Sequence, residues 1–167
     1  MALFPGGFGT HDEGMEVLTL VQTGKADPMP IVMIERPGDS YWADWKKYVV
    51  KNLLKTGRIS PEDMNIFRVT DSVEKAAKEI THFYHNYRSL RYVKDRLVIR
   101  LQRALSEELL EKIREEFKDI CVKGSTFESV AAFPEERDHR DLPRVAFPFN
   151  RYNFGRLRRL VDFLNEG

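Results

Sequence analysis

A glycine-rich segment near the start of the chain constrains its fold more than any other feature of the sequence. It reads FPGGFGT from Phe4 to Thr10, between a short apolar run and a helical pattern. Glycine has no side chain, so Gly6, Gly7 and Gly9 allow positive φ angles and a close approach to a ligand. We expect their N–H groups to bind a phosphate beside the positive end of the following helix.

Strand and helix patterns alternate three times in the first half of the chain. Apolar runs predict buried strands of a parallel sheet at residues 1–4, 30–35 and 65–69. The stretches between and after them predict helices at residues 10–23, 41–55 and 72–92, the last capped by Asp71 or Ser72. This order is typical of an α/β fold, here a partial Rossmann-like sheet with flanking helices.

The pattern changes in the second half of the chain. Residues 96–103 alternate apolar and charged side chains, which predicts a strand in a sheet with one wet face. An amphipathic helix (106–120), a charged loop (134–141), a strand (144–147) and a basic helix (153–165) are expected to follow. We therefore predict a domain over 1–92 and a small α+β C-terminal module over 93–167, with the seam near Ser89 to Asp95.

Composition narrows the classes of partner and compartment. A formal charge of +1 over 167 residues gives no global field to attract nucleic acid or an anionic membrane, and both are disfavoured as partners. The single cysteine, Cys121, excludes an internal disulfide and is interpreted as a small buried hydrophobe. No apolar run approaches the roughly 20 residues needed to span a bilayer. We expect a cytoplasmic protein.

Two interpretations of the segment that follows the glycines remain open. Thr10 can offer its hydroxyl to a bound phosphate, and Glu13 can reach sugar hydroxyls beyond it, as in a nucleotide site. Alternatively, Thr10 and Glu13 form a capping box that only starts the helix. Asp12 stands where a dinucleotide fingerprint has glycine, and no Gly-Lys-Ser/Thr follows, so NAD binding and ATP hydrolysis are disfavoured.

The segment from Pro5 to Glu13 resembles the PGGxGTxxE signature of the LONELY GUY family, whose members are also called "possible lysine decarboxylases". The stretch from Leu20 to Lys25 and the pair Tyr41-Trp42 are also similar to that family's pattern. The resemblance extends from about Met1 to Tyr92. Lysine decarboxylation itself is disfavoured, because no lysine with a pyridoxal-binding apparatus is evident.

The resemblance implies a Rossmann-like fold and hydrolysis of the N-glycosidic bond of a nucleoside 5′-monophosphate such as AMP, releasing the base and ribose 5-phosphate. It makes Gly6, Gly7, Phe8, Gly9 and Thr10 the phosphate and nucleotide site. Glu13 becomes the catalytic carboxylate that engages the ribose and its developing positive charge. No metal or redox cofactor is implied. Asp12 and Glu16 could support the site, or could be solvated helix acids.

Part of the family's pattern has no counterpart in this sequence. A first βα unit with its own glycine-rich turn and a catalytic arginine are both missing. Three parallel strands alone would expose a backbone edge. We therefore expect either a C-terminal fragment of a longer protein or a chain completed by a second copy or by a separate N-terminal half. A non-catalytic nucleotide-binding or regulatory module is the alternative function.

Two weaker signals favour structural roles. His82 and His85 are three residues apart, but no third metal ligand is evident nearby, so a metal site is disfavoured. The arginines at 151, 156, 158 and 159 could bind RNA or an acidic partner, but a solvated helix face is favoured.

Overall fold

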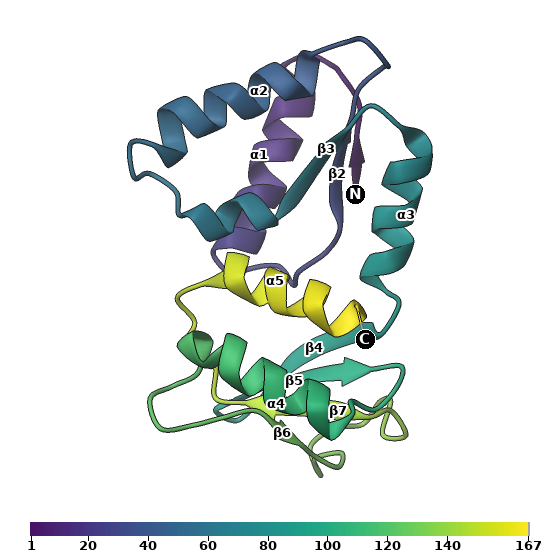
Figure 1. Cartoon of the computed structure of the whole chain (residues 1–167), viewed down its shortest axis with the longest axis vertical. Coiled ribbons are helices and arrows are strands. Elements are labelled where there is room, and N and C mark those ends of the chain that lie inside the picture. The colour runs from purple at the N-terminus through teal and green to yellow at the C-terminus, as the bar shows by residue number, and fades with distance from the viewer. Residues whose placement is uncertain (167) are drawn as a thin grey trace. The chain divides into compact units, whose positions relative to one another are not determined.

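The computed structural model describes residues 1–166 and contains two compact units (Figure 1). Unit 1 consists of residues 1–82 and 154–159, and unit 2 contains 83–153 together with the residues from 160 onward. Unit 1 holds a three-stranded parallel sheet and unit 2 a four-stranded antiparallel sheet. The predicted fold class, a partial parallel sheet with flanking helices followed by an α+β module, is confirmed.

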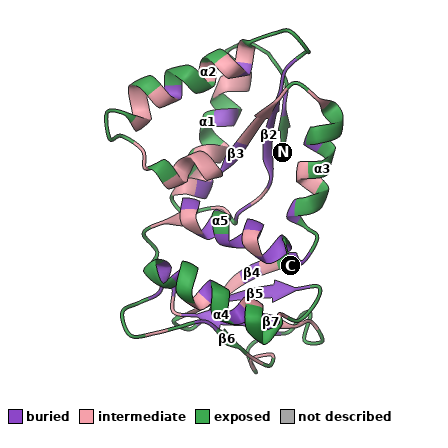
Figure 2. Cartoon of the chain, in the orientation of Figure 1, coloured by how far each residue is buried: buried purple, intermediate pink, exposed green. Residues whose placement is uncertain are grey.

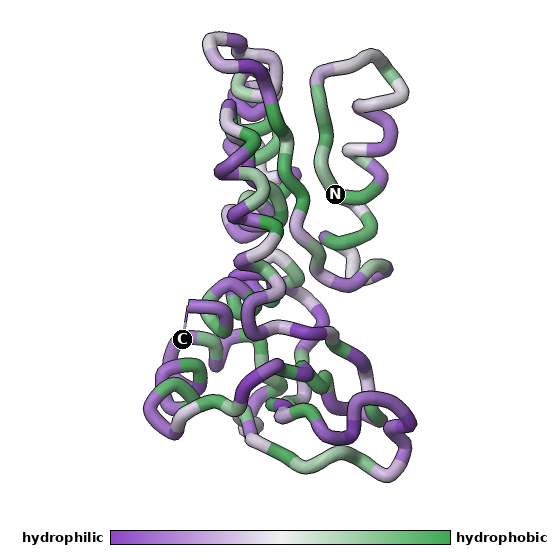
Figure 3. The backbone as a smooth tube through the Cα atoms, turned by 90° about the vertical axis from the view of Figure 1, so that its right-hand side faces the viewer, coloured by the Kyte–Doolittle hydropathy of each residue, from purple (hydrophilic) through white to green (hydrophobic). Residues whose placement is uncertain are grey.

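The sheet of unit 1 has the strand order β1-β2-β3, with β1 at Ala2–Leu3, β2 at Ile31–Ile34 and β3 at Phe67–Thr70. All three strands run parallel. Every residue of β2 is buried, as Figure 2 shows, because helices cover both faces of this central strand. The N-terminal strand is coloured hydrophobic in Figure 3, and the helix after it alternates between hydrophobic and hydrophilic residues.

The helices of unit 1 follow the predicted order. They are α1 (Phe8–Gln22), α2 (Tyr41–Val49) with a π-helical continuation (Val50–Leu54), a 3₁₀ turn (Pro61–Asn65) and α3 (Val73–Phe83). Side chains of α1 and α2 pack with Ile31 and Met33 on one face of the sheet. The helix α3 covers the other face (Figure 1). Its Ala76 and Ile80 pack there against Val32 and Ile34.

The prediction of one helix over residues 72–92 was wrong at its C-terminal end. The helix α3 ends at Phe83, and Tyr87–Val93 form strand β4, which pairs with β5 through a two-residue turn in which Lys94 has a φ of 56°. Buried Leu90 faces the same side as its partner Ile99, while Arg91 pairs with Val98 on the opposite side. This period of two favours a strand over the helix predicted for residues 72–92.

Unit 2 is an antiparallel sheet with helices on one side. Its strands are β4, β5 (Arg96–Leu101), β6 (Glu128–Ser129) and β7 (Arg144–Phe147), in the order β4-β5-β7-β6. Its helical segments are α4 (Glu107–Glu116), a 3₁₀ turn (Lys118–Ile120) and the C-terminal part of α5 (Phe154–Asn165). The Ser106 hydroxyl caps α4 by accepting a bond from the Leu109 N–H.

The predicted wet face of this sheet is also wrong, because both faces of β5 are buried. Val98 and Arg100 lie on the face expected to be solvated, yet they are 0% and 6% exposed. Val130 and Phe133 pack over this face against Val98. Arg100 is neutralised by Glu136, which lies in the predicted charged loop, residues 134–141. An arginine with a buried carboxylate partner therefore occupies a position where the alternating charge pattern predicts solvent exposure.

Gly155 at the start of α5 fits against the backbone of the 3₁₀ turn in unit 1. A Cβ atom there would lie 2.3 Å from the Glu62 carbonyl oxygen and 2.8 Å from the Asp63 nitrogen. Backbone cannot yield as a flexible side chain does, so we expect Gly155→Ala to destabilise unit 1 by about 1–3 kcal/mol. The measurement is urea unfolding followed by the fluorescence of Trp42 and Trp45. Gly9→Ala is the control, since its Cβ meets nothing within 4 Å; equal stability of both variants would contradict this packing.

Cys121 is buried, as predicted. Burial, with a smaller contribution from Asp119, raises the pKa of its thiol to about 11. Across residues 1–166, no helix is both long and apolar enough to cross a bilayer.

Candidate functional site

The glycine turn links the carboxyl end of β1 to the N-terminus of α1. Gly7 is the N-cap, and its carbonyl oxygen accepts bonds from the Thr10 and His11 N–H groups at 3.1 and 3.3 Å. Helical geometry therefore leaves the N–H groups of Phe8 and Gly9 without intrahelical acceptors. No side chain caps the helix, and Thr10 lies inside its first turn. The capping-box interpretation of Thr10 and Glu13 is therefore wrong.

The expectation that these glycines take positive φ angles is also wrong. Within residues 1–166, the glycines with positive φ are Gly24, Gly38, Gly57 and Gly124. Space requires glycine at Gly6 only. A Cβ at Gly6 would lie 2.1 Å from the Thr10 hydroxyl oxygen, whereas a Cβ at Gly7 or Gly9 would meet nothing within 4 Å.

The remaining predicted site residues are open to solvent. Phe8 is 96% exposed, and Glu13 lies one turn further along α1 with its side chain also exposed. In the described part of the chain, no hydrogen bond or ion pair holds the Glu13 carboxylate. It is therefore free to engage a ligand, as are the exposed carboxylates of Asp12 and Glu16.

Tyr41, at the start of α2, reaches the glycine turn. Its hydroxyl oxygen lies 2.5 Å from the Gly6 carbonyl oxygen and 2.8 Å from Nε2 of His11. The rings of His11 and Tyr41 also contact each other, with centroids 5.7 Å apart, and the buried Trp42 ring lies edge-on to both. The pair Tyr41-Trp42 belongs to the predicted family pattern, which assigns neither residue a role.

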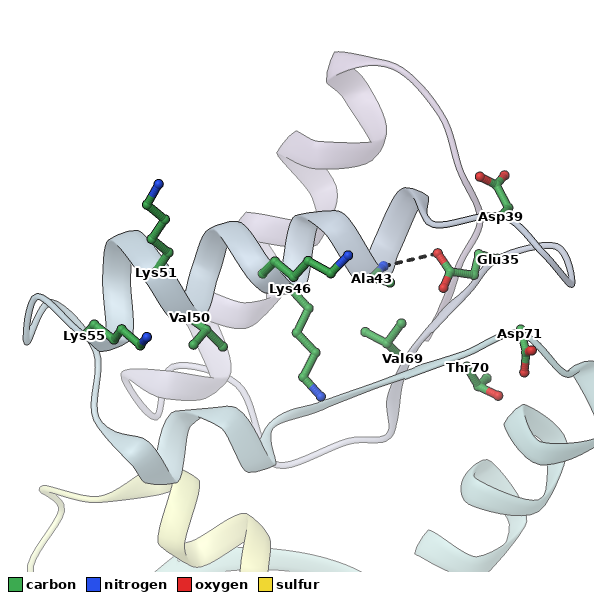
Figure 4. A pocket seen from close by; sticks show the side chains of 11 residues that line it. Glu35, Asp39, Ala43, Lys46, Val50, Lys51, Lys55, Val69, Thr70 and Asp71 are labelled. Atoms are coloured by element: carbon green, nitrogen blue, oxygen red, sulfur yellow. Dashed lines mark hydrogen bonds between the residues drawn. The ribbon is translucent and has the colours of Figure 1, made fainter.

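Glu35 is a buried acid at this end of the sheet that sequence analysis missed. It follows β2 directly and is 8% exposed. Its Oε2 accepts bonds from the backbone N–H groups of Trp42 (2.7 Å) and Ala43 (3.2 Å), the latter shown as a dashed line in Figure 4. Glu35 therefore caps α2 from another element, a favourable position for a carboxylate at a helix N-terminus. An acidic residue ending an apolar strand was the available signal.

A groove of about 800 Å³ lies at the carboxyl ends of the strands, where parallel α/β sheets generally bind ligands. We call it the carboxyl-edge groove. Its lining combines apolar side chains, four carboxylates and one cation: Phe4, Pro5, Ile34, Pro37 and Val73; Glu35, Asp39, Asp71 and Glu74; and Arg36, together with Ser72. The acidic excess favours hydroxyl and amino groups as ligands over anions.

A second groove, of about 770 Å³, runs along α2 and β3 (Figure 4). We call it the lysine groove, because Lys46, Lys47, Lys51 and Lys55 line it. Lys47 is paired with Asp44, whose hydrogen bond raises the pKa of the lysine. The strand β3 is the last in its sheet, and lysines beside an open strand edge discourage pairing with other chains. We therefore interpret these lysines as protection of the strand edge.

The structure does not bring all the predicted site residues into one cavity. Glu13 and residues 6–10 line neither the carboxyl-edge groove nor the lysine groove, although Phe4 and Pro5 line the former. Arg36 lies in the carboxyl-edge groove. Arg68, in contrast, is held by the carbonyl groups of Asn65 and Phe67.

Two other residues noted in the sequence, His85 and Arg158, contact side chains of the fold. His85 lies beyond the end of α3 and contacts Arg103. Among residues 1–166, no three His, Cys, Asp or Glu side chains are grouped to hold a metal ion. Arg158 is 1% exposed and bonds to Glu79 at 3.0 Å, so at this position the predicted solvated helix face is wrong.

A parallel sheet with a glycine turn that enters a helix at its carboxyl edge is a Rossmann-like arrangement. Comparison with protein families identifies it further: residues 1–80 match the family described as "Possible lysine decarboxylase". The resemblance predicted from the motif is thereby confirmed, and this part of the chain carries the family's sequence pattern. A comparison with curated proteins gives no match.

Proposed function

We propose that this protein hydrolyses the N-glycosidic bond of a nucleoside 5′-monophosphate, releasing the base and ribose 5-phosphate. The observation that carries the proposal is the open turn at the start of α1. It offers unbonded N–H groups next to a helix N-terminus, and an unpaired carboxylate, Glu13, lies one turn further along the same helix. A phosphate anchor beside a free carboxylate suits a sugar phosphate.

Each site residue has a separate role in this proposal. The backbone of Gly6, Gly7, Phe8 and Gly9 holds the phosphate, and Thr10 fixes the turn by packing beneath Gly6. Glu13 stabilises the positive charge that develops on the ribose as the glycosidic bond breaks. These roles need neither a metal nor a redox cofactor.

The proposal includes a partner that covers the open edge of β1. Within residues 1–166, only β2 pairs with β1, and the neighbouring side chains of Phe4 and Phe8 are 57% and 96% exposed. A second copy or a complementing N-terminal half would bury these rings and enclose Glu13. An arginine from the same partner would supply the cation that the turn lacks.

A second candidate function is nucleotide or phosphate binding without chemistry. The observation that favours it is the position of Glu13, which lines neither groove. In that case the turn would still hold an anion, and unit 2 would serve regulation or assembly.

Base release separates the two functions. AMP and other nucleoside monophosphates are incubated with the chain alone and with an added N-terminal half, and the free base is measured by chromatography. We expect release when the partner is supplied. Ligand binding without release in both preparations would overturn the enzymatic proposal and favour the binding module.

A further inference from the structure

The contact between Tyr41 and the glycine turn has a defined direction. A tyrosine hydroxyl has one proton to donate, and it lies between two acceptor-capable atoms, the Gly6 oxygen at 2.5 Å and His11 Nε2 at 2.8 Å. The Gly6 oxygen cannot donate, so the short contact to it requires the Tyr41 proton. Nε2 of His11 must then carry its own proton and donate it to the Tyr41 oxygen.

This direction fixes the orientation of the peptide that joins Gly6 to Gly7. In a planar trans peptide, the carbonyl and the following N–H point in opposite directions. Holding the Gly6 carbonyl toward the Tyr41 hydroxyl therefore aims the Gly7 N–H away from that hydroxyl. A turn made of glycines would otherwise rotate easily.

We propose that Tyr41 and His11 are positioning residues that hold the glycine turn in its anion-binding conformation. The inference rests on the proposed function, because it assigns these side chains a purpose in the same phosphate site. His11 orients the Tyr41 hydroxyl, the hydroxyl holds the Gly6 carbonyl, and the Gly7 N–H is presented to the phosphate. Neither side chain needs to touch the ligand.

The surroundings of Tyr41 keep this arrangement rigid. Trp42, its neighbour in α2, is 1% exposed within the core of unit 1, and the buried Glu35 carboxylate holds the first turn of the helix. The clamp therefore connects the turn after β1 to the helix after β2. Rigid donors bind an anion more tightly because less conformational entropy is lost on binding.

The test combines three variants with a ligand-free measurement. Tyr41→Phe removes only the hydroxyl, and we expect it to weaken ribose 5-phosphate binding in calorimetry about tenfold, the effect of one hydrogen bond. His11→Leu should cause a similar loss, while His11→Gln, whose amide can donate to Tyr41, should recover part of the affinity. Tyr48→Phe, at an exposed tyrosine of the same helix, should bind like the wild type.

Nitrogen-15 NMR of the free protein at pH 8 provides a second measurement. Its signals would not change if Tyr41 and His11 only stabilised the fold. We expect His11 to carry a proton on Nε2, and we expect a Gly7 amide shift that changes in Tyr41→Phe but not in Tyr48→Phe. An Nδ1–H form, or unchanged affinity in Tyr41→Phe, would overturn the clamp. Wild-type protein that binds no ribose 5-phosphate would overturn both the clamp and the phosphate site. Binding with these effects but without base release would leave the clamp standing and remove only the enzymatic function.

Discussion

Glu13→Gln should lower the rate of base release from AMP by about 10²–10³-fold in a preparation that cleaves it. The substitution keeps the size of the side chain and removes its charge, so the positive charge on the ribose loses its stabilisation in the transition state. Ribose 5-phosphate should still bind, because in the proposed site the backbone of residues 6–9 holds the phosphate. The measurements are base release by chromatography and ribose 5-phosphate affinity by calorimetry.

Glu16→Gln is the matched control for this variant. Glu16 lies on the same helix, is equally exposed and loses the same charge. We expect it to retain most of the activity. Equal losses in the two variants would show that the general negative charge of α1 matters rather than the Glu13 carboxylate, and an active Glu13→Gln protein would exclude the proposed catalytic role.

The parallel sheet of unit 1 could be predicted because its sequence signals are local. A continuous apolar run at 30–35 fits only a strand covered on both faces, and β2 is buried along its whole length. The helix predicted for residues 84–92 was wrong for a physical reason. The local pattern is compatible with either a strand or a helix, and pairing with β5 stabilises the strand. Such pairing is not visible within a short window of sequence.

The candidate site could be predicted only in its backbone part. The motif from Pro5 to Glu13 identified the turn, but the partners that shape it are distant in sequence. Tyr41 reaches Gly6 across 35 positions, and Glu35 caps a helix that it does not belong to. Such contacts depend on the spatial order of the strands, which a local sequence pattern does not contain.

A buried carboxylate with two arginines holds the loop of unit 2 against its sheet. Glu136 is 1% exposed, and its Oε1 accepts bonds from Nε and a terminal nitrogen of Arg100 at 3.0 and 2.8 Å. Its Oε2 accepts the Phe133 N–H and lies 3.4 Å from Nε of Arg144, which is 2% exposed. Removing this carboxylate leaves two buried guanidinium groups without their counter-charge.

We therefore expect Glu136→Gln to destabilise unit 2 by about 3–5 kcal/mol, the cost of breaking a buried ion pair. The measurement is native-state hydrogen exchange of the β5 and β7 amides, which report on this sheet directly. Glu135→Gln is the control, because Glu135 makes a solvent-exposed pair with Lys94 and should change the exchange rates little. Similar protection in Glu136→Gln and the wild type would contradict the role of Glu136.

The effect of Glu136 should also depend on pH. Burial alone would raise its pKa, but the Phe133 N–H bond and the guanidinium groups of Arg100 and Arg144 outweigh burial and hold the pKa below the ordinary value of 4.5. A carboxyl group with a depressed pKa contributes its full stability above that ordinary value and loses it as the pH falls through the folded-state pKa. The difference in unfolding free energy between wild type and Glu136→Gln should therefore be constant above about pH 5.5 and shrink in more acidic solution. A difference that grows on acidification would mean that Glu136 is protonated in the folded protein.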